Sequence, residues 1–285
     1  MKPRILLLIL FSILASCCLA AQQKPNPDSK QEGLAIWARL KLMTQSEFED
    51  LMAKAQSGDA AAQYKIGLAY DMGTHVPKDF HETVRWFLKS AEQEYPPAEG
   101  AYGLSLRQSN KAASELWMLR AAEHGDASTQ FWLGVAYESN WFGITDSQQA
   151  LKWYRKAADA GDPDAQVVLG QKYADGEDVE QNYELAANWF WRAAEHVPDL
   201  GGAGQGRWQL AQLYMEGLGV PRDYVQAYFW LSLHGPNSAT EAKAHLSDAQ
   251  VRGADKLVEV WKEQHPVSPE VEAASEILNP ESAPD

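Results

Sequence analysis

The residues with the clearest potential for chemistry are a glycine-rich run and two histidines. Residues 201–206, Gly-Gly-Ala-Gly-Gln-Gly, are of the type that binds phosphate, but no strand-like segment precedes them, so we interpret the run as a flexible joint. His124 and His196 could each offer an imidazole to a metal ion. Both occupy the same place in a repeated phrase, at the expected end of a helix, where a histidine favours the negative end of the helix dipole and solvent.

The rest of the chain offers no better catalytic candidate. Beyond residue 20 the sequence has no nucleophile elbow, no zinc-ligand spacing and no phosphate loop. Acidic residues are frequent, but with 39 Asp and Glu against 25 Lys and Arg a carboxylate pair is more often a solvated face than an acid and a base. We therefore expect no catalytic residue, no metal and no cofactor, and hence not an enzyme.

Charge and composition narrow the classes of partner. The chain has 285 residues, 45% of them hydrophobic, which is enough for a folded core. Its formal net charge of -14 opposes binding to nucleic acid, because binding to phosphate backbones relies on Lys and Arg. We exclude nucleic acid, and we expect contact with a membrane only through an N-terminal lipid.

The first twenty residues form a separate segment. Lys2 and Arg4 precede an apolar run over residues 5–14, and small residues follow up to Ala20, a pattern typical of a secretory signal peptide. The run of about 10 residues would span roughly 15 Å as a helix, half of a hydrocarbon core of about 30 Å. A permanent transmembrane helix is therefore the weaker interpretation.

Both cysteines lie in this segment. Leu14-Ala15-Ser16-Cys17 resembles a bacterial lipobox, and that resemblance implies cleavage before Cys17 and lipid attachment to its thiol. Ordinary cleavage near Ala20 would instead remove both thiols, and the sequence leaves the two alternatives open. We expect an exported protein, located in the periplasm, anchored to the outer membrane as a lipoprotein, or secreted. Its stability must come from packing, since no disulfide framework is available.

One phrase recurs along the rest of the chain. "LKWYRKAADAGDPDAQVVLG" at residues 151–170 is echoed by "LWMLRAAEHGDASTQFWLG" at residues 116–134. Five aligned copies follow one another at spacings of 31 to 41 residues, starting at Ala62, Ala98, Thr129, Ala165 and Gly206. This period is typical of solenoids built from pairs of helices.

The recurring letters have structural roles in such a pair. An Asp that can cap the first helix stands at Asp59, Asp126 and Asp162. Inside that helix, a glycine costs about 1 kcal/mol relative to alanine, which indicates close approach of the second helix. These glycines are Gly67, Gly134 and Gly170. The second helix carries a Trp followed by two small residues, as in Trp153, Ala157 and Ala158.

This pattern resembles the Sel1-like repeats, relatives of the tetratricopeptide repeats. The match is carried by Ala62-Gln63, Ala165-Gln166, Gly217-Leu218-Gly219-Val220, Trp153-Tyr154 and Ala157-Ala158 with Gly161. The resemblance implies an all-α fold, a right-handed superhelical solenoid of about five helix-turn-helix repeats. The copy at 98–128 is degenerate, because it lacks the Tyr and the loop glycine. The sequence therefore does not predict how this copy packs.

These observations divide the chain into five parts. They are a signal peptide at 1–20, a polar linker at 21–45, a repeat solenoid with an N-terminal capping helix at 46–245, a C-terminal capping helix at 246–265 and a disordered acidic tail at 266–285. Ser247 and Gln250 are spaced as a capping box at the start of the last helix.

In related arrays the first helix of each pair lines a concave face. The inward positions, which we expect to bind a partner, are Tyr64, Leu68, Asp71, Phe131, Val135, Glu138, Val167, Gln171, Trp208 and Gln212. Aromatic residues beside carboxylates suggest a groove for a protein or peptide segment with apolar anchors and basic character. The alternative is that the aromatic residues pack within their own hairpin.

The resemblance implies a non-enzymatic scaffold or regulator in the bacterial envelope. The alternative is an envelope protein that binds or hydrolyses cell-wall or β-lactam compounds, as assigned to some cysteine-rich relatives. Those relatives carry a cysteine pair in each repeat, and the repeats of this chain carry none.

Overall fold

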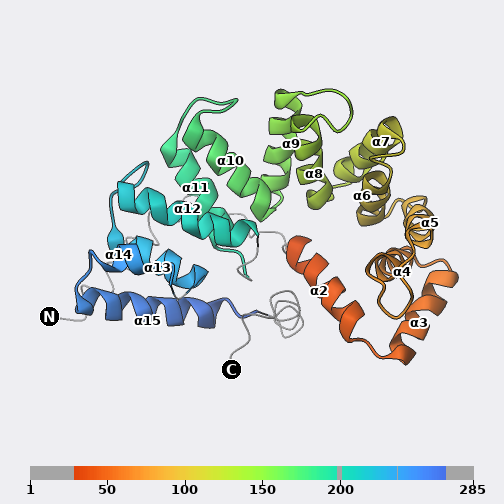
Figure 1. Cartoon of the computed structure of the whole chain (residues 1–285), viewed down its shortest axis with the longest axis horizontal. Helices are drawn as coiled ribbons and strands as arrows, with labels where there is room; N and C mark the ends of the chain where they lie inside the picture. Colours follow the sequence, from red (N-terminus) through yellow and green to blue (C-terminus); the bar gives the residue numbers. More distant parts are fainter. Residues whose placement is uncertain (1–28, 198–200, 236, 268–285) are drawn as a thin grey trace.

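The computed structural model describes residues 29–197, 201–235 and 237–267. Within these ranges the chain forms helices and no strand, and the helices follow one another along an arc (Figure 1). They are α2 Ser29–Leu42, α3 Gln45–Gln56, α4 Ala60–Met72, α5 Phe80–Ala91, α6 Pro96–Ser105, α7 Lys111–Glu123, α8 Ala127–Glu138, α9 Ser147–Asp159, α10 Pro163–Asp175, α11 Tyr183–Ala194, α12 Gly202–Glu216, α13 Tyr224–His234, α14 Thr240–Lys243 and α15 Asp248–Gln264. The predicted all-α solenoid is confirmed.

Five helical hairpins form the array. They are α4–α5, α6–α7, α8–α9, α10–α11 and α12–α13, and from the second hairpin on each first helix also packs against the second helix of the hairpin before it. The apolar core consequently runs along the arc as three successive clusters, formed in chain order around α3–α5, α7–α10 and α10–α15. This order is what a repeated sequence produces when each unit buries its apolar face against its neighbours.

The predicted aspartate caps are present at the start of the first helices. The side chains of Asp59, Asp126 and Asp162 accept the N–H of the residue three positions later, at 2.7, 2.6 and 2.8 Å. Gly58, Gly125 and Gly161 directly precede them with φ of 105°, 92° and 98°. At these positive φ values glycine lets one helix end and the next begin within a few residues.

A buried polar side chain near the start of each first helix makes the joint between successive hairpins. The amides of Gln63, Gln130 and Gln166 donate to the carbonyls of Ala55 (3.1 Å), Ala122 (2.9 Å) and Ala158 (3.1 Å) in the last turn of the preceding helix. Because the last carbonyls of a helix lack partners inside the helix, these bonds satisfy acceptors that would otherwise be buried and unpaired. We call this contact the inter-hairpin joint.

Two hairpins replace the glutamine of the joint. Arg207 stands at this position in α12, is 2% exposed, and donates to the carbonyls of Ala194, His196 and Leu233. It therefore joins the ends of α11 and α13. Glu99 stands at the position in α6, but a carboxylate cannot donate to a carbonyl. Glu99 instead contacts its own hairpin, through His124 Nδ1 at 2.7 Å and Arg120 at 3.2 Å.

The glycines inside the first helices mark where an aromatic ring of the second helix meets the backbone. A Cβ added at Gly67, Gly134 or Gly170 would lie 2.5 Å from a ring carbon of Phe87, Tyr154 or Phe190, respectively. Close approach at these glycines was predicted, and the ring explains it. In the degenerate second hairpin Gly103 plays this role with Met118, whose Cγ would lie at 2.8 Å.

The glycine-rich run at 201–206 is not a flexible joint. Residues from Gly202 onward belong to α12. A Cβ at Gly202 would collide with the backbone of Pro163, and one at Gly206 would lie 2.7 Å from Ala193 Cβ. These glycines allow α12 to pack closely on its neighbours, which corrects the prediction.

Residues 29–42, part of the expected linker at 21–45, form helix α2, so that prediction is corrected as well. Ala38 and Leu40 of α2 are 0% and 1% exposed, which accounts for order in this segment. Helix α3 begins after a capping box at Thr44, close to the expected capping helix. The capping box of Ser247 and Gln250 is present at α15. The signal peptide, Cys17 and residues 268–285 of the expected tail lie outside the described residues.

Replacing Gly134 with alanine tests the close approach. The added methyl would overlap the Tyr154 ring, so we expect Gly134→Ala to lower the free energy of unfolding by about 1–3 kcal/mol. Gly253 in α15 is the matched control, because a Cβ there meets nothing within 4 Å. Gly253→Ala should raise stability by about 0.5–1 kcal/mol. Urea unfolding measures both, and a neutral or stabilising effect of Gly134→Ala would contradict the account.

Candidate partner-binding groove

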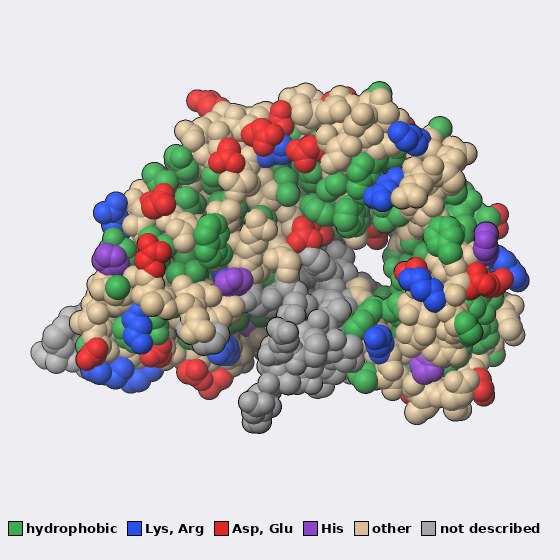
Figure 2. Space-filling model, in the orientation of Figure 1, with side chains coloured by type: hydrophobic (Ala, Val, Ile, Leu, Met, Phe, Trp, Pro, Cys, Tyr) green, Lys and Arg blue, Asp and Glu red, His purple; other side chains and the backbone are tan. Residues whose placement is uncertain are grey.

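In the first three hairpins the first helix lies on the inner side of the arc. Figure 1 shows α4, α6 and α8 inside α5, α7 and α9, as expected for the lining of a concave face. Figure 2 shows hydrophobic side chains on this inner side and an open hollow beside it. We call this inner surface the groove.

The predicted aromatic row is partly engaged within its own hairpins. Tyr64 is half-buried, with its ring centroid 5.7 Å from those of Phe87 and Tyr95. Phe131 is half-buried too, 5.9 Å from Tyr154. Trp208 differs, because 45% of it is exposed. Tyr64 and Phe131 therefore fit the interpretation of packing among neighbouring rings, whereas contact of Trp208 with a partner stays a prediction.

Val167 does not belong to the open surface. It is 5% exposed and joins the core cluster that continues into α11–α13. The reason is that α12 packs against α10 as well as against α11. This corrects the prediction that Val167 contacts a partner. Leu68, Val135 and Gln212 are half-buried at the remaining positions of the rows.

The polar positions of the groove are engaged to different degrees. Gln171 accepts from Gln209 Nε2 and donates to Asp175, both at 2.7 Å, and so links α10 with α12. Asp71 is exposed, with Lys78 at 3.9 Å. This distance and exposure make a weak pair, so the charge of Asp71 is available to a partner.

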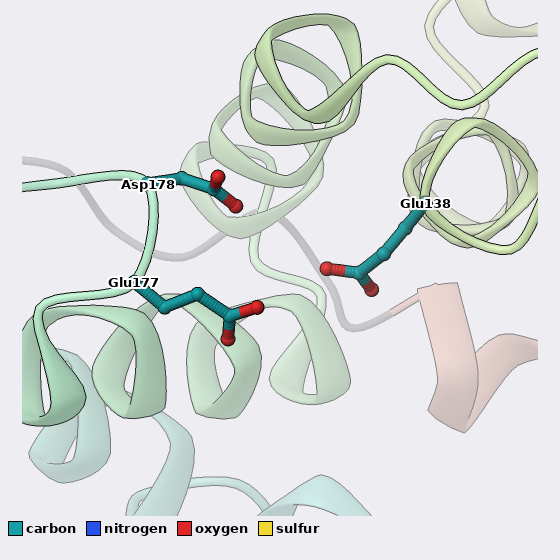
Figure 3. Close-up of side chains that lie close together, drawn as sticks. All are labelled: Glu138, Glu177 and Asp178. Atoms are coloured by element: carbon teal, nitrogen blue, oxygen red, sulfur yellow. The ribbon is translucent and has the colours of Figure 1, made fainter.

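Glu138 belongs to a cluster of three carboxylates on the inner side. Figure 3 shows Glu138 from α8 facing Glu177 and Asp178, which follow α10. Their oxygens lie within 4.8 Å of one another, so in the described part of the chain this group has the spacing of a metal site. Three carboxylates without a cation would repel one another.

Lys172 supplies the positive charge to the cluster. Its side chain is 4% exposed, and its Nζ lies 2.8 Å from Glu138, 3.0 Å from Asp178 and 3.8 Å from Glu177. The ammonium group thus fills the role a metal ion would have. Tyr154 donates to the other oxygen of Glu138 at 2.8 Å. The cluster is a structural ion-pair network between α8 and the loop after α10.

The pKa shifts agree with this role. Burial by itself lowers the pKa of Lys172, but the hydrogen bonds to Glu138 and Asp178 outweigh it, so the pKa is raised. The hydrogen bond from Lys172 lowers the pKa of Asp178. Lys172 therefore stabilises the fold below the pKa of an unfolded lysine. Asp178 stabilises the fold above the pKa of an unfolded aspartic acid. This contribution is lost as the pH falls through the lowered pKa of Asp178 in the folded protein.

The sequence analysis did not identify an aromatic pair in the third hairpin, of which Trp132 is exposed and Trp141 half-buried. Trp132 is 37% exposed, and its ring stacks on Trp141 with centroids 5.8 Å apart. Arg107 from the preceding hairpin lies 4.4 Å from the centroid of Trp141. The copies hold Lys65, Val168 and Gln209 at the position of Trp132. Because the other copies have no tryptophan at this position, a comparison of residues shared between the repeats does not identify Trp132.

Helix α2 also lies on the inner side of the arc, where it contacts α4 and α8 (Figure 1). His75 Nε2 lies 2.9 Å from the carbonyl of Leu40. A carbonyl only accepts, so this nitrogen carries the proton. Among the described helices, none combines the length and the apolar character needed to cross a membrane.

Comparison with known proteins identifies the repeats. The family model described as Sel1 repeat matches residues 60–95, 100–126, 127–162, 163–196 and 205–233. These five segments correspond to the five hairpins. No curated protein matches the chain.

Three solved structures illustrate the likeness. A Sel1 repeat protein from Oxalobacter formigenes is 21% identical, with a TM-score of 0.58, over 76% of this chain and 99% of that one. An immunity protein from Pseudomonas aeruginosa is 16% identical, with a TM-score of 0.50, over 75% and 84%. A protective antigen of uropathogenic Escherichia coli strains, displaying an SLR fold, is 26% identical, with a TM-score of 0.46, over 85% of this chain. The match spans 61% of that antigen's length.

Removing the ammonium of Lys172 tests the cluster. Lys172→Met leaves three carboxylates without a cation, so we expect a loss of about 2 kcal/mol of stability at pH 7, since the partners are partly exposed. The loss should shrink below about pH 4, where the carboxylates take up protons. Lys54→Met, an exposed lysine of α3, is the control and should change stability by less than about 0.5 kcal/mol. Equal unfolding midpoints for the two variants would refute the role of Lys172.

Proposed function

This chain belongs to the Sel1 repeat family, and on that premise we propose that it is a non-enzymatic scaffold or regulator of the bacterial envelope that binds a protein partner in its groove. The Sel1 repeat fold itself points to protein–protein interaction. The described part of the chain supplies no observation that favours the alternative of binding or hydrolysing cell-wall or β-lactam compounds.

The exposure of the Trp208 side chain is the observation that supports this function most directly. Trp208 on the first helix α12 is 45% exposed, whereas the rings of Tyr64 and Phe131 at the same repeat position are half-buried, so Trp208 leaves apolar surface open to a partner. Exposed aromatic side chains of this kind dominate the energy of many interfaces once a partner covers them. The nearby half-buried Gln212 offers an amide beside it on α12.

Charge favours a partner with basic character. The chain carries a net charge of -14, and Asp71 is an exposed carboxylate with only a weak pair. Glu138 contributes less than its position suggests, because Lys172 neutralises much of it. Complementary charge of this kind raises association rates and selects partners more than it raises affinity.

Export supports the same role. Lys2, Arg4 and the apolar run over residues 5–14 have the form of a secretory signal peptide, which would place the array outside the cytoplasm. Lipid on Cys17 would hold it at a membrane, and cleavage near Ala20 would release it.

Site-specific cross-linking tests the groove. With the photoreactive residue p-benzoylphenylalanine in place of Trp208, we expect cross-links to a partner in envelope extracts of the native host. The control position is Leu116 on the second helix α7, which is 59% exposed. Trp208→Ala should weaken binding of that partner by at least about 10-fold, the size of a hot-spot effect, while Leu116→Ala should not. Cross-linking of the same proteins from both positions would argue against the groove.

Mass spectrometry of the mature protein tests export. We expect a chain that lacks the first sixteen residues and carries a lipid mass on Cys17, or one that begins near Ala21 without lipid. Labelling with a fatty-acid analogue separates these two products. Recovery of the protein from the cytoplasm with residues 1–20 intact would exclude both.

A further inference from the structure

Helix α2 is an addition to the repeat array. It lies before the first matched repeat, which begins at residue 60, and only Met43 and Thr44 separate it from α3. In the described part of the chain its main contacts beyond this link are with α4 and α8, on either side of the second hairpin. It therefore bridges hairpins that are not adjacent, along the inner side of the arc (Figure 1).

The structure holds α2 by apolar burial and by a hydrogen bond near its C-terminal end. Ala38 and Leu40 are 0% and 1% exposed. His75 donates from Nε2 to the Leu40 carbonyl at 2.9 Å, and its ring stacks on Phe48 with centroids 4.9 Å apart. The bond ties the C-terminal end of α2 to the loop that follows α4, so α2 is docked on the array.

The chemistry of α2 matches what the groove is expected to bind. Its sequence, SKQEGLAIWARLKL, combines a helical apolar segment with two cations in its last turn. Both cations, Arg39 and Lys41, are exposed, whereas Ala38 and Leu40 beside them are buried. A short helix with apolar anchors and basic residues is the kind of segment that suits an apolar groove on an acidic protein.

We propose that α2 is a tethered occupant of the groove between α4 and α8, and that the partner binds by inserting a helix of the same chemistry in its place. This inference rests on the proposed function and deepens it, since it names the form of the partner segment. A tethered segment acts at a high effective concentration, so α2 reduces the apparent affinity of any competing helix. Between α4 and α8 the groove is thus closed to helices that bind weakly, while the main contacts of α2 do not include α12, which carries Trp208.

A synthetic peptide tests the proposal on the full chain. The probe is a fluorescein-labelled peptide with the sequence of residues 29–42, and its binding is followed by fluorescence anisotropy. Leu40→Asp places a charge at a buried position of α2 and should release the helix from the groove. We expect this variant to bind the peptide at least 10-fold more tightly than the wild type.

Leu42→Asp is the matched control, because the same substitution two residues later falls on a side chain that is 56% exposed. It should bind the peptide as weakly as the wild type. Equal binding by all three proteins, or no binding by Leu40→Asp, would overturn the proposal.

A second measurement needs no variant. Excess peptide added to the wild type should accelerate hydrogen exchange in α2 while α4 and α8 stay protected. An unchanged exchange rate in α2 at saturating peptide would also overturn the proposal. Neither experiment involves an outside partner, so their outcome is independent of whether cross-linking from Trp208 finds one.

Discussion

The hydrogen bond from a buried side chain to the end of the preceding helix, present at the joints of Gln63, Gln130, Gln166 and Arg207, is the constraint on which the array depends. The joint places the end of one helix and the start of the next in the core, where unpaired carbonyls are costly. Gln63, Gln130 and Gln166 each pair one such carbonyl, and Arg207 pairs three from two helices. Because the same bond recurs, each hairpin is set on the last in nearly the same way, and the sum of these placements is the arc.

Much of this architecture could be predicted because its determinants are local and repeated. Asp59, Asp126 and Asp162 act as caps within three residues, and Gly134 is needed because of a ring twenty positions later in the same hairpin. The features that escaped prediction depend on distant contacts. The glycines at 202 and 206 read as a flexible joint, since their contacts lie on Pro163 and Ala193. Helix α2 has a glycine at position 33 and no repeat to compare it with.

The candidate site was harder to predict than the fold, because a position in a repeat does not determine exposure. Tyr64, Val167 and Trp208 share one register, yet one packs on its hairpin, one is core and one is exposed. The environment of each is set by the neighbouring hairpin, as when α12 covers part of α10. The charge of Glu138 likewise depends on Lys172, which comes from another helix. Register gives the direction of a side chain, and packing decides what it meets.

The glutamate in the second joint has a mechanical consequence. Glu99 turns to His124 and Arg120, and the carbonyl of Ala91, which a glutamine would reach, accepts from the nearby Glu94 N–H. The connection between the first two hairpins therefore lacks the side-chain bond to the preceding helix that is found at the other joints, and the packing of α6 against α5 joins them instead. Helix α2 contacts α4 on one side of this connection and α8 beyond it, and so provides a second link across the second hairpin. If α2 were undocked, the angle between these hairpins would depend only on the packing of each first helix against the helix before it.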